Sequence, residues 1–183
     1  MASYVYTYIV PSTTAGANKR LLDLFNGSGS GKIIRVKSIR PIADTDVTAS
    51  TLVGVRLLLW RTSTVGTGGT AWNYKSATLD VAGGTVSPQD SSYPSIPAQI
   101  TARHLPSGGA ALAEWLRGMY LMTASASTSM GYLFQGQHNI LDIDETCCQD
   151  LTLREGEGIY IQQGAVASLG SYRFRVTFSV DDE

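Results

Sequence analysis

Residues 171–180 read SYRFRVTFSV, and they alternate in character along their whole length. The even-numbered positions are apolar or aromatic, and the odd-numbered positions are Ser, Thr or Arg. Side chains on a β-strand point alternately to the two faces of its sheet, so this pattern predicts an antiparallel strand with one buried face and one wet face.

Other segments have the same strand-like character, since they are rich in β-branched and aromatic residues. They cover residues 3–10, 21–25, 32–42, 51–61, 151–153 and 158–162, with weaker candidates at 131–134 and 139–143. The sequence NGSGSG at 26–31 opens with an Asn-Gly pair, which predicts a hairpin between two of these strands. Several short strands separated by turn signals predict an all-β fold, a jelly-roll-like antiparallel β-sandwich that forms a single domain over residues 1–183.

The middle of the chain has a different amino-acid composition. Residues from about 62 to 110 are rich in Gly, Ser, Thr, Ala and Pro, with few apolar anchors. We expect one or two short strands within a long excursion, which could extend as an arm toward a neighbouring molecule. The segment 110–122, AALAEWLRGMYLM, is the only plausible helix, because its apolar residues recur at a spacing near 3.6, although its Gly118 also allows a strand.

Charge and composition exclude several classes of partner. Charged residues make up 16% of the chain, against about 25% in typical domains, and the net charge is -1. The best basic stretch is KIIRVKSIR at 32–40, where strict alternation places Lys32 and Arg40 on one face and Arg35 and Lys37 on the other. A focused basic patch is therefore not expected, and we predict no nucleic-acid partner.

The sequence also predicts no membrane partner. No segment reaches the roughly 18 apolar residues that a membrane-spanning helix needs. The first residues lack the basic and apolar regions of a signal peptide, so we expect synthesis in a cytoplasm. The only two cysteines, Cys147 and Cys148, are adjacent, which favours reduced thiols packed as small apolar side chains.

The candidate catalytic and ligand-binding motifs do not match known motifs in residue type or spacing. The run GSGSGK at 27–32 is not a phosphate-binding loop, because Asn26 replaces its first glycine and Ile33 its final Ser or Thr. Asp142, Asp144 and Glu145 lack the pattern of a calcium loop. The two histidines, at 104 and 138, have no flanking ligand pattern. We predict no enzyme activity, with no catalytic, cofactor-binding or metal-binding residues.

Aromatic side chains form the remaining candidate site. One group lies on a single face of the N-terminal strand, and the other lies in or beside the Gly/Ser-rich region. Such residues can cap a sandwich core, form a protein interface or stack on a sugar, and the sequence leaves all three open. The candidate interface residues are Tyr4, Tyr6, Tyr8, Trp72, Tyr74, Tyr93 and Trp115.

Two segments resemble the virion proteins of tailed bacteriophages. Residues 24–36, LFNGSGSGKIIRV, resemble a turn and strand of their β-sandwiches, and LREGEGIYI at 153–161 is similar to the penultimate strands of viral and phage jelly rolls. The resemblance implies a capsid cement (decoration) protein on the capsid surface of the virion. Such a protein is usually a homotrimer that binds the major capsid protein or other virion proteins, and it has no catalytic residues. The alternative is a carbohydrate-binding or host-recognition jelly-roll module of a phage tail or fibre.

Overall fold

The computed structural model describes residues 3–14, 16–43, 53–75, 83–108, 111–123, 141–142, 151–165 and 171–183. All regular secondary structure in these residues is β-strand, as the alternating patterns predicted. The described part of the chain therefore holds no helix with the length and apolar character needed to cross a membrane.

Eight strands pair in nested order, the first with the last and so on inward. Each pair is antiparallel. The pairs are β1 (Ser3–Ile9) with β14 (Ser171–Asp182), β3 (Arg20–Asn26) with β13 (Glu157–Gln163), β4 (Lys32–Ala43) with β12 (Leu151–Leu153), and β5 (Val53–Thr62) with β10 (Ala111–Thr123). This is the connectivity of a long hairpin rolled into two sheets, which defines a jelly roll.

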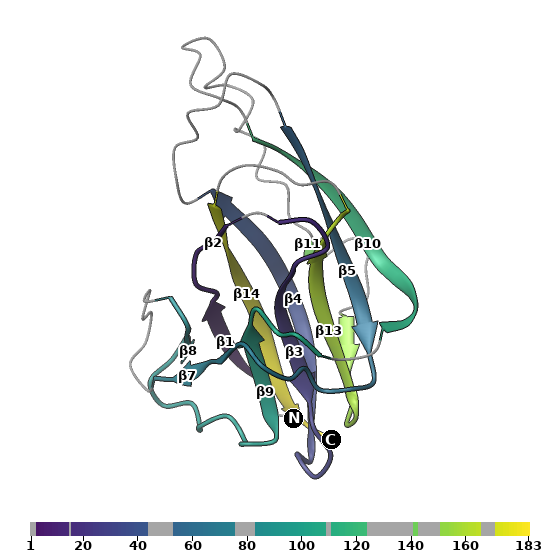
Figure 1. Cartoon of the computed structure of the whole chain (residues 1–183). Coiled ribbons are helices and arrows are strands. Elements are labelled where there is room, and N and C mark those ends of the chain that lie inside the picture. Colours follow the sequence, from purple (N-terminus) through teal and green to yellow (C-terminus); the bar gives the residue numbers. More distant parts are fainter. Residues whose placement is uncertain are drawn as a thin grey trace.

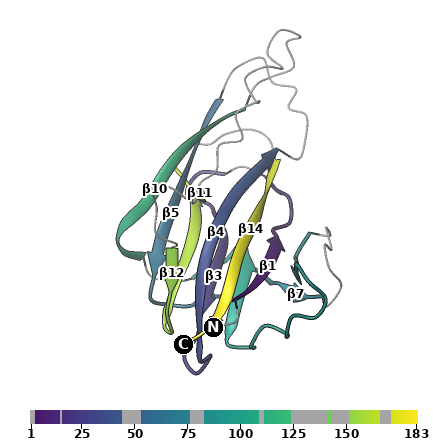
Figure 2. The ribbon, with the colours of Figure 1, turned by 180° about the vertical axis from the view of Figure 1, so that it is seen from behind.

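The strands form two packed sheets (Figures 1 and 2). In the first sheet the order is β11-β4-β14-β1-β8-β7, where β11 is Leu141–Asp142, β12 also pairs with β4, and β2 (Thr13–Thr14) pairs with β14. In the second sheet the order is β10-β5-β13-β3-β9-β6. Both termini lie at one end of the sandwich, since Ser3 pairs with Asp181.

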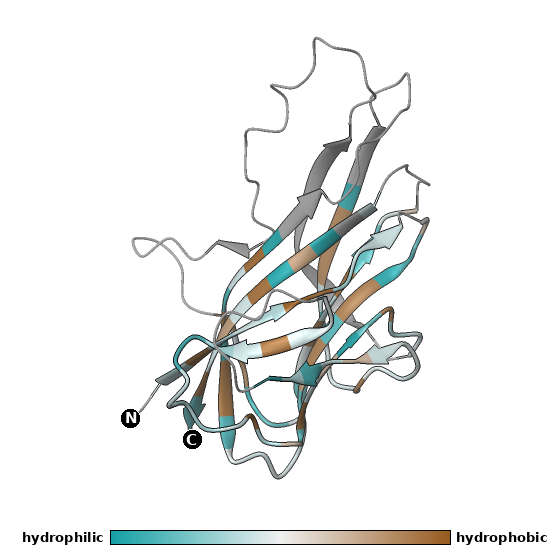
Figure 3. Cartoon of the chain, turned by 90° about the vertical axis from the view of Figure 1, so that its left-hand side faces the viewer, coloured by the Kyte–Doolittle hydropathy of each residue, from teal (hydrophilic) through white to brown (hydrophobic). Residues whose placement is uncertain are grey.

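The core lies between the sheets and follows the alternation of the strands. On β14 the even-numbered Phe174, Val176, Phe178 and Val180 are buried, as predicted. Hydrophobic and hydrophilic bands accordingly alternate along the strands (Figure 3). The second sheet contributes Leu22, Leu24, Leu57, Leu59, Ile159 and Ile161 among others.

The excursion between β5 and β10 folds back on the sandwich. It contains four short strands where one or two were expected: β6 (Thr70–Ala71), β7 (Asn73–Tyr74), β8 (Thr85–Pro88) and β9 (Ile100–His104). Strand β8 adds to β1 of the first sheet, and β9 adds to β3 of the second. The inserted residues therefore widen both sheets on the same side of the sandwich.

Residues 111–123 form a strand, so the helical alternative for 110–122 is wrong. Strand β10 pairs with β5, and its register shifts between Ala111 and Trp115 and again between Trp115 and Arg117. The first shift places two extra residues on β10 and the second places one, and each interrupts the two-residue alternation of a regular strand.

The turn at 26–31 is not a hairpin, because β3 and β4 belong to different sheets. Asn26 is fully buried, and its side-chain amide donates to the carbonyls of Lys32 (2.7 Å) and Leu153 (3.1 Å). Glu155 accepts from the backbone N–H groups of Gly29 (3.1 Å) and Gly31 (2.6 Å). Residues 24–36 and 153–161 thus form one interlocked unit at this end of the sandwich.

A β-bulge on β4 overturns the predicted division of its cations. The residues of this strand that are fully buried are Ile34, Val36 and Ile39, so the interval between inward side chains is two and then three. The register agrees, because Phe178 lies opposite Val36 and Thr177 opposite Ser38. Beyond the bulge the faces exchange, and Arg40 lies on the same outer face as Arg35.

Candidate functional site

The aromatic residues of β1 pack into a chain of rings. Tyr4, Tyr6 and Tyr8 share the inner face of the strand, and Tyr6 and Tyr8 are only 1% exposed. The ring of Tyr93 meets those of Tyr4 and Tyr6 edge-on, with centroids 5.2 and 6.2 Å apart. Such pairs contribute about 0.5–1.5 kcal/mol each beyond burial. Tyr6 and Tyr8 are therefore core residues, whereas Tyr4 and Tyr93 keep part of their surface exposed.

Trp72 joins this chain from the inserted region. Its ring stacks on Phe178 at 5.9 Å and meets Tyr8 edge-on at 5.6 Å. Phe178 also stacks on Tyr6 at 5.9 Å. The indole is therefore held from two sides, while part of it remains exposed.

A second attachment of the inserted region comes from Tyr6. Its hydroxyl donates to the carbonyl of Pro94 at 2.6 Å. Burial, with a smaller contribution from Tyr74, raises the pKa of Tyr6 well above its ordinary value, so the hydroxyl stays protonated and remains a donor. The loop around Pro94 is thereby fixed over the end of β1.

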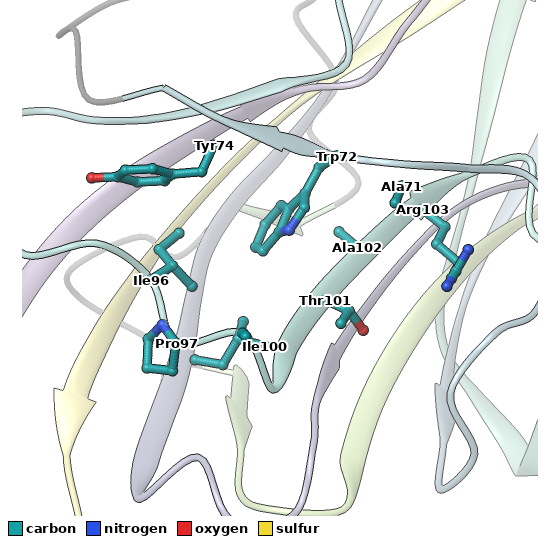
Figure 4. A pocket seen from close by; sticks show the side chains of 10 residues that line it. Ala71, Trp72, Tyr74, Ile96, Pro97, Ile100, Thr101, Ala102 and Arg103 are labelled. Atoms are coloured by element: carbon teal, nitrogen blue, oxygen red, sulfur yellow. The ribbon is translucent and has the colours of Figure 1, made fainter.

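Trp72 and Tyr74 form one wall of a pocket of about 310 Å³, which we call the Trp72 pocket. Ile96, Pro97 and Ile100 lie across from them (Figure 4). The pocket lies where the inserted strands bridge the two sheets, and its remaining lining residues are Ala71, Ala98, Thr101, Ala102 and Arg103.

The Trp72 pocket combines apolar walls with a few polar groups. The indole of Trp72 and the hydroxyl of Tyr74 make no hydrogen bond within the described part of the chain. Thr101 Oγ1 is buried and has no partner there. Ligand pockets generally pair apolar walls with a few such groups, and this volume is at the small end of their range. The arrangement suits a small neutral ligand with one apolar face.

A buried carboxylate lies next to this pocket. Asp23 on β3 is 3% exposed, and its Oδ1 accepts from the backbone N–H of Arg103 at 2.7 Å. Burial raises the pKa of Asp23 to about 6, although the hydrogen bond and the charge of Arg103 oppose this shift. Sequence reasoning missed this residue, yet an acid inside the apolar strand LLDLF was a visible signal.

Trp115 lies apart from the other aromatic candidates. It belongs to β10 and is opposite Trp60 in register, and its side chain is outside the described part. Trp60 stacks on Tyr160 at 6.2 Å, and the guanidinium of Arg20 lies 4.4 Å from the centre of the Tyr160 ring. Trp60 and Tyr160 were not predicted as site residues.

The residues considered for metal or acid–base chemistry do not gather in the described part. His104 contacts the hydroxyl of Thr13, and burial lowers the pKa of its imidazole. His138, Asp144, Glu145, Cys147 and Cys148 lie outside the described residues, as does the candidate strand at 131–134. No three His, Cys, Asp or Glu side chains come together among the residues that the structure describes.

The chain matches no family model, and neither a curated protein nor a solved structure is similar to it at a significant level.

Proposed function

We propose that this protein is a structural component of a tailed-phage virion, a capsid cement protein that binds the head lattice and stabilises contacts between capsomers. One observation carries the proposal. The two phage-like segments, 24–36 and 153–161, meet through Asn26 and Glu155 in a jelly roll. Their resemblance therefore concerns one structural unit rather than two unrelated turns.

The composition supports the same proposal. Interfaces in assemblies have cores depleted in charge, and only 16% of this chain is charged. A cement protein acts through many weak contacts that symmetry repeats over a particle, so no single deep site is required. The partners in this proposal are two further copies of the chain and the major capsid protein.

Light scattering on a sizing column tests the self-association. The purified chain is expected to elute with three chain masses, independent of concentration over the micromolar range. When the protein is added to virus heads that lack it, the protein should sediment together with the heads. A monomer that does not sediment with the heads would contradict the cement proposal.

The Trp72 pocket favours a second candidate, a carbohydrate-binding module of a phage tail or fibre. Aromatic walls with free hydrogen-bonding groups suit the apolar face and hydroxyls of a sugar ring. Because Trp72 is packed on Phe178 and Tyr8, its removal would also disturb the core. Tyr74 is the better test, since it lines the pocket without being fully buried.

On this second candidate, Tyr74→Ala is expected to abolish binding on a glycan array, because it removes one aromatic wall. Tyr93→Ala, which removes an aromatic ring outside the pocket, is expected to leave glycan binding intact. Absence of glycan binding by the unmodified chain, or equal losses in both variants, would exclude the Trp72 pocket as a sugar site.

A further inference from the structure

The outer face of the first sheet gathers cations from two neighbouring strands. On β14, Arg173 and Arg175 alternate with buried Phe174 and Val176, so they point away from the core. On β4 the bulge at Lys37 and Ser38 brings Arg40 to the same side as Arg35. We call this surface the basic face; its cations are Arg35, Lys37, Arg40, Arg173 and Arg175.

Two of these arginines lie directly opposite each other. Arg40 pairs in register with Arg175, and both are exposed. Lys37, Arg40 and Arg175 have no hydrogen bond or ion pair with the residues that the structure describes. Like charges directly opposite on adjacent strands are destabilising, and a bound anion would remove that cost.

Two acids of the described residues pair with cations at one end of this face. Asp181 binds Arg35 at 2.7 Å, and Asp182 forms an ion pair with Lys32, both close to the termini. Strand β11 places Asp142 opposite Ser38. Among the described residues of this part of the face, the three cations Lys37, Arg40 and Arg175 therefore outnumber the one acid that lies near them in register, Asp142.

The remaining side chains of the face indicate which anion would bind. Thr7, Thr177 and Ser38 lie in one cross-strand row beside the arginines. Arg, Lys, Ser and Thr are the side chains that contact nucleic-acid phosphates. The hot spots of protein interfaces also use Arg but are enriched in Trp and Tyr, and the described outward side chains of β1, β4 and β14 include no aromatic ring.

From this geometry we propose that the basic face binds the phosphate backbone of nucleic acid without sequence selectivity. The contacts are ion pairs from Lys37, Arg40 and Arg175, with hydroxyl hydrogen bonds from Thr177 and Ser38. This activity goes beyond the proposed cement function and does not depend on it, because it requires neither a trimer nor a capsid.

Fluorescence anisotropy with a labelled mixed-sequence DNA duplex and a labelled single strand tests the proposal on the full chain. Three phosphate contacts predict that duplex affinity falls about 40-fold, and single-strand affinity about 20-fold, between about 50 and 200 mM salt. Arg40→Gln combined with Arg175→Gln should weaken binding about 10-fold or more at the lower salt and reduce the salt slope by about 2.

A matched control removes the same charge elsewhere. Lys19→Gln combined with Arg56→Gln changes two cations of the other sheet, one directly before β3 and one on β5, and should leave the affinity within about 2-fold. Thermal unfolding of all variants confirms that they fold. Three outcomes would overturn the proposal: no DNA binding at low salt, equal losses in the two double variants, or competition by polyglutamate as effective as competition by unlabelled DNA.

Discussion

Asn26→Asp is expected to destabilise the folded protein by about 4 kcal/mol or more, an exceptionally large effect for a single polar substitution. The change is nearly isosteric but replaces the amide donor with a carboxylate oxygen. The carbonyls of Lys32 and Leu153 would lose their donor and face a negative charge at hydrogen-bond distance. Each buried polar group left without a partner costs about 1–3 kcal/mol, and a buried unpaired charge costs more.

The hydroxyl of Ser30 can still donate to the new side chain, as it does to Asn26 Oδ1 at 2.7 Å. That single remaining bond cannot offset two lost ones. The substitution should therefore loosen the link between the turn at 26–31 and the end of β12. Urea unfolding followed by tryptophan fluorescence measures the effect as a lower midpoint with an unchanged slope.

Asn73→Asp provides the control for Asn26→Asp. Asn73 is exposed on β7, so the same chemical change should alter stability by no more than about 0.5 kcal/mol. If the unfolding free energy of Asn26→Asp lies within about 1 kcal/mol of that of the unmodified chain, the amide of Asn26 does not hold the turn at 26–31 to the end of β12.

The strands that the sequence predicted most clearly are those whose pattern is local and uninterrupted. The alternation of 171–180 reappears as β14, and the apolar segment at 51–61 as β5. In both segments, the apolar or polar character of a residue predicts which face of the sheet it lies on, and no knowledge of the partner strand is needed. The fold class followed from many such segments, whereas the nested pairing depends on contacts between residues far apart in the chain.

Bulges, and turns that cross from one sheet to the other, could not be predicted from such local patterns. The bulge at Lys37 is set by the register against β14, which the β4 sequence alone does not contain. The turn at 26–31 has hairpin chemistry, yet Asn26 and Glu155 direct it from one sheet to the other. The four inserted strands have two to five residues each and are defined mainly by their neighbours.

The candidate site was partly visible in the sequence. The shared face of Tyr4, Tyr6 and Tyr8 followed from strand periodicity, and it is the inner face. Burial could not be read from composition, because an aromatic face is equally compatible with a core and with an interface. The contact of Trp72 with Phe178 joins residues more than 100 positions apart, so only the folded chain places the pocket beside β1.

Asp23→Asn is expected to flatten the pH dependence of the protein's stability. Folding raises the pKa of Asp23 from 3.8 to about 6, so the folded state binds this proton more tightly than the unfolded state does. Stability from this group is therefore full at low pH and is lost as the pH rises from about 4 to about 6. The loss is about 3 kcal/mol in total, of which about 1–2 kcal/mol falls between pH 5 and 7.5.

The asparagine keeps an oxygen for the N–H of Arg103 but never ionises, so the difference in unfolding free energy between variant and unmodified chain should grow as the pH rises from 5 to 7.5. Urea titrations at several pH values measure it. Asp90→Asn is the control, because Asp90 is exposed and hydrogen bonds from Ser92 lower the pKa of its carboxyl. A constant difference between the Asp23 variant and the unmodified chain across this range would mean that the buried carboxylate titrates at its ordinary pKa, in which case its burial does not penalise its charge.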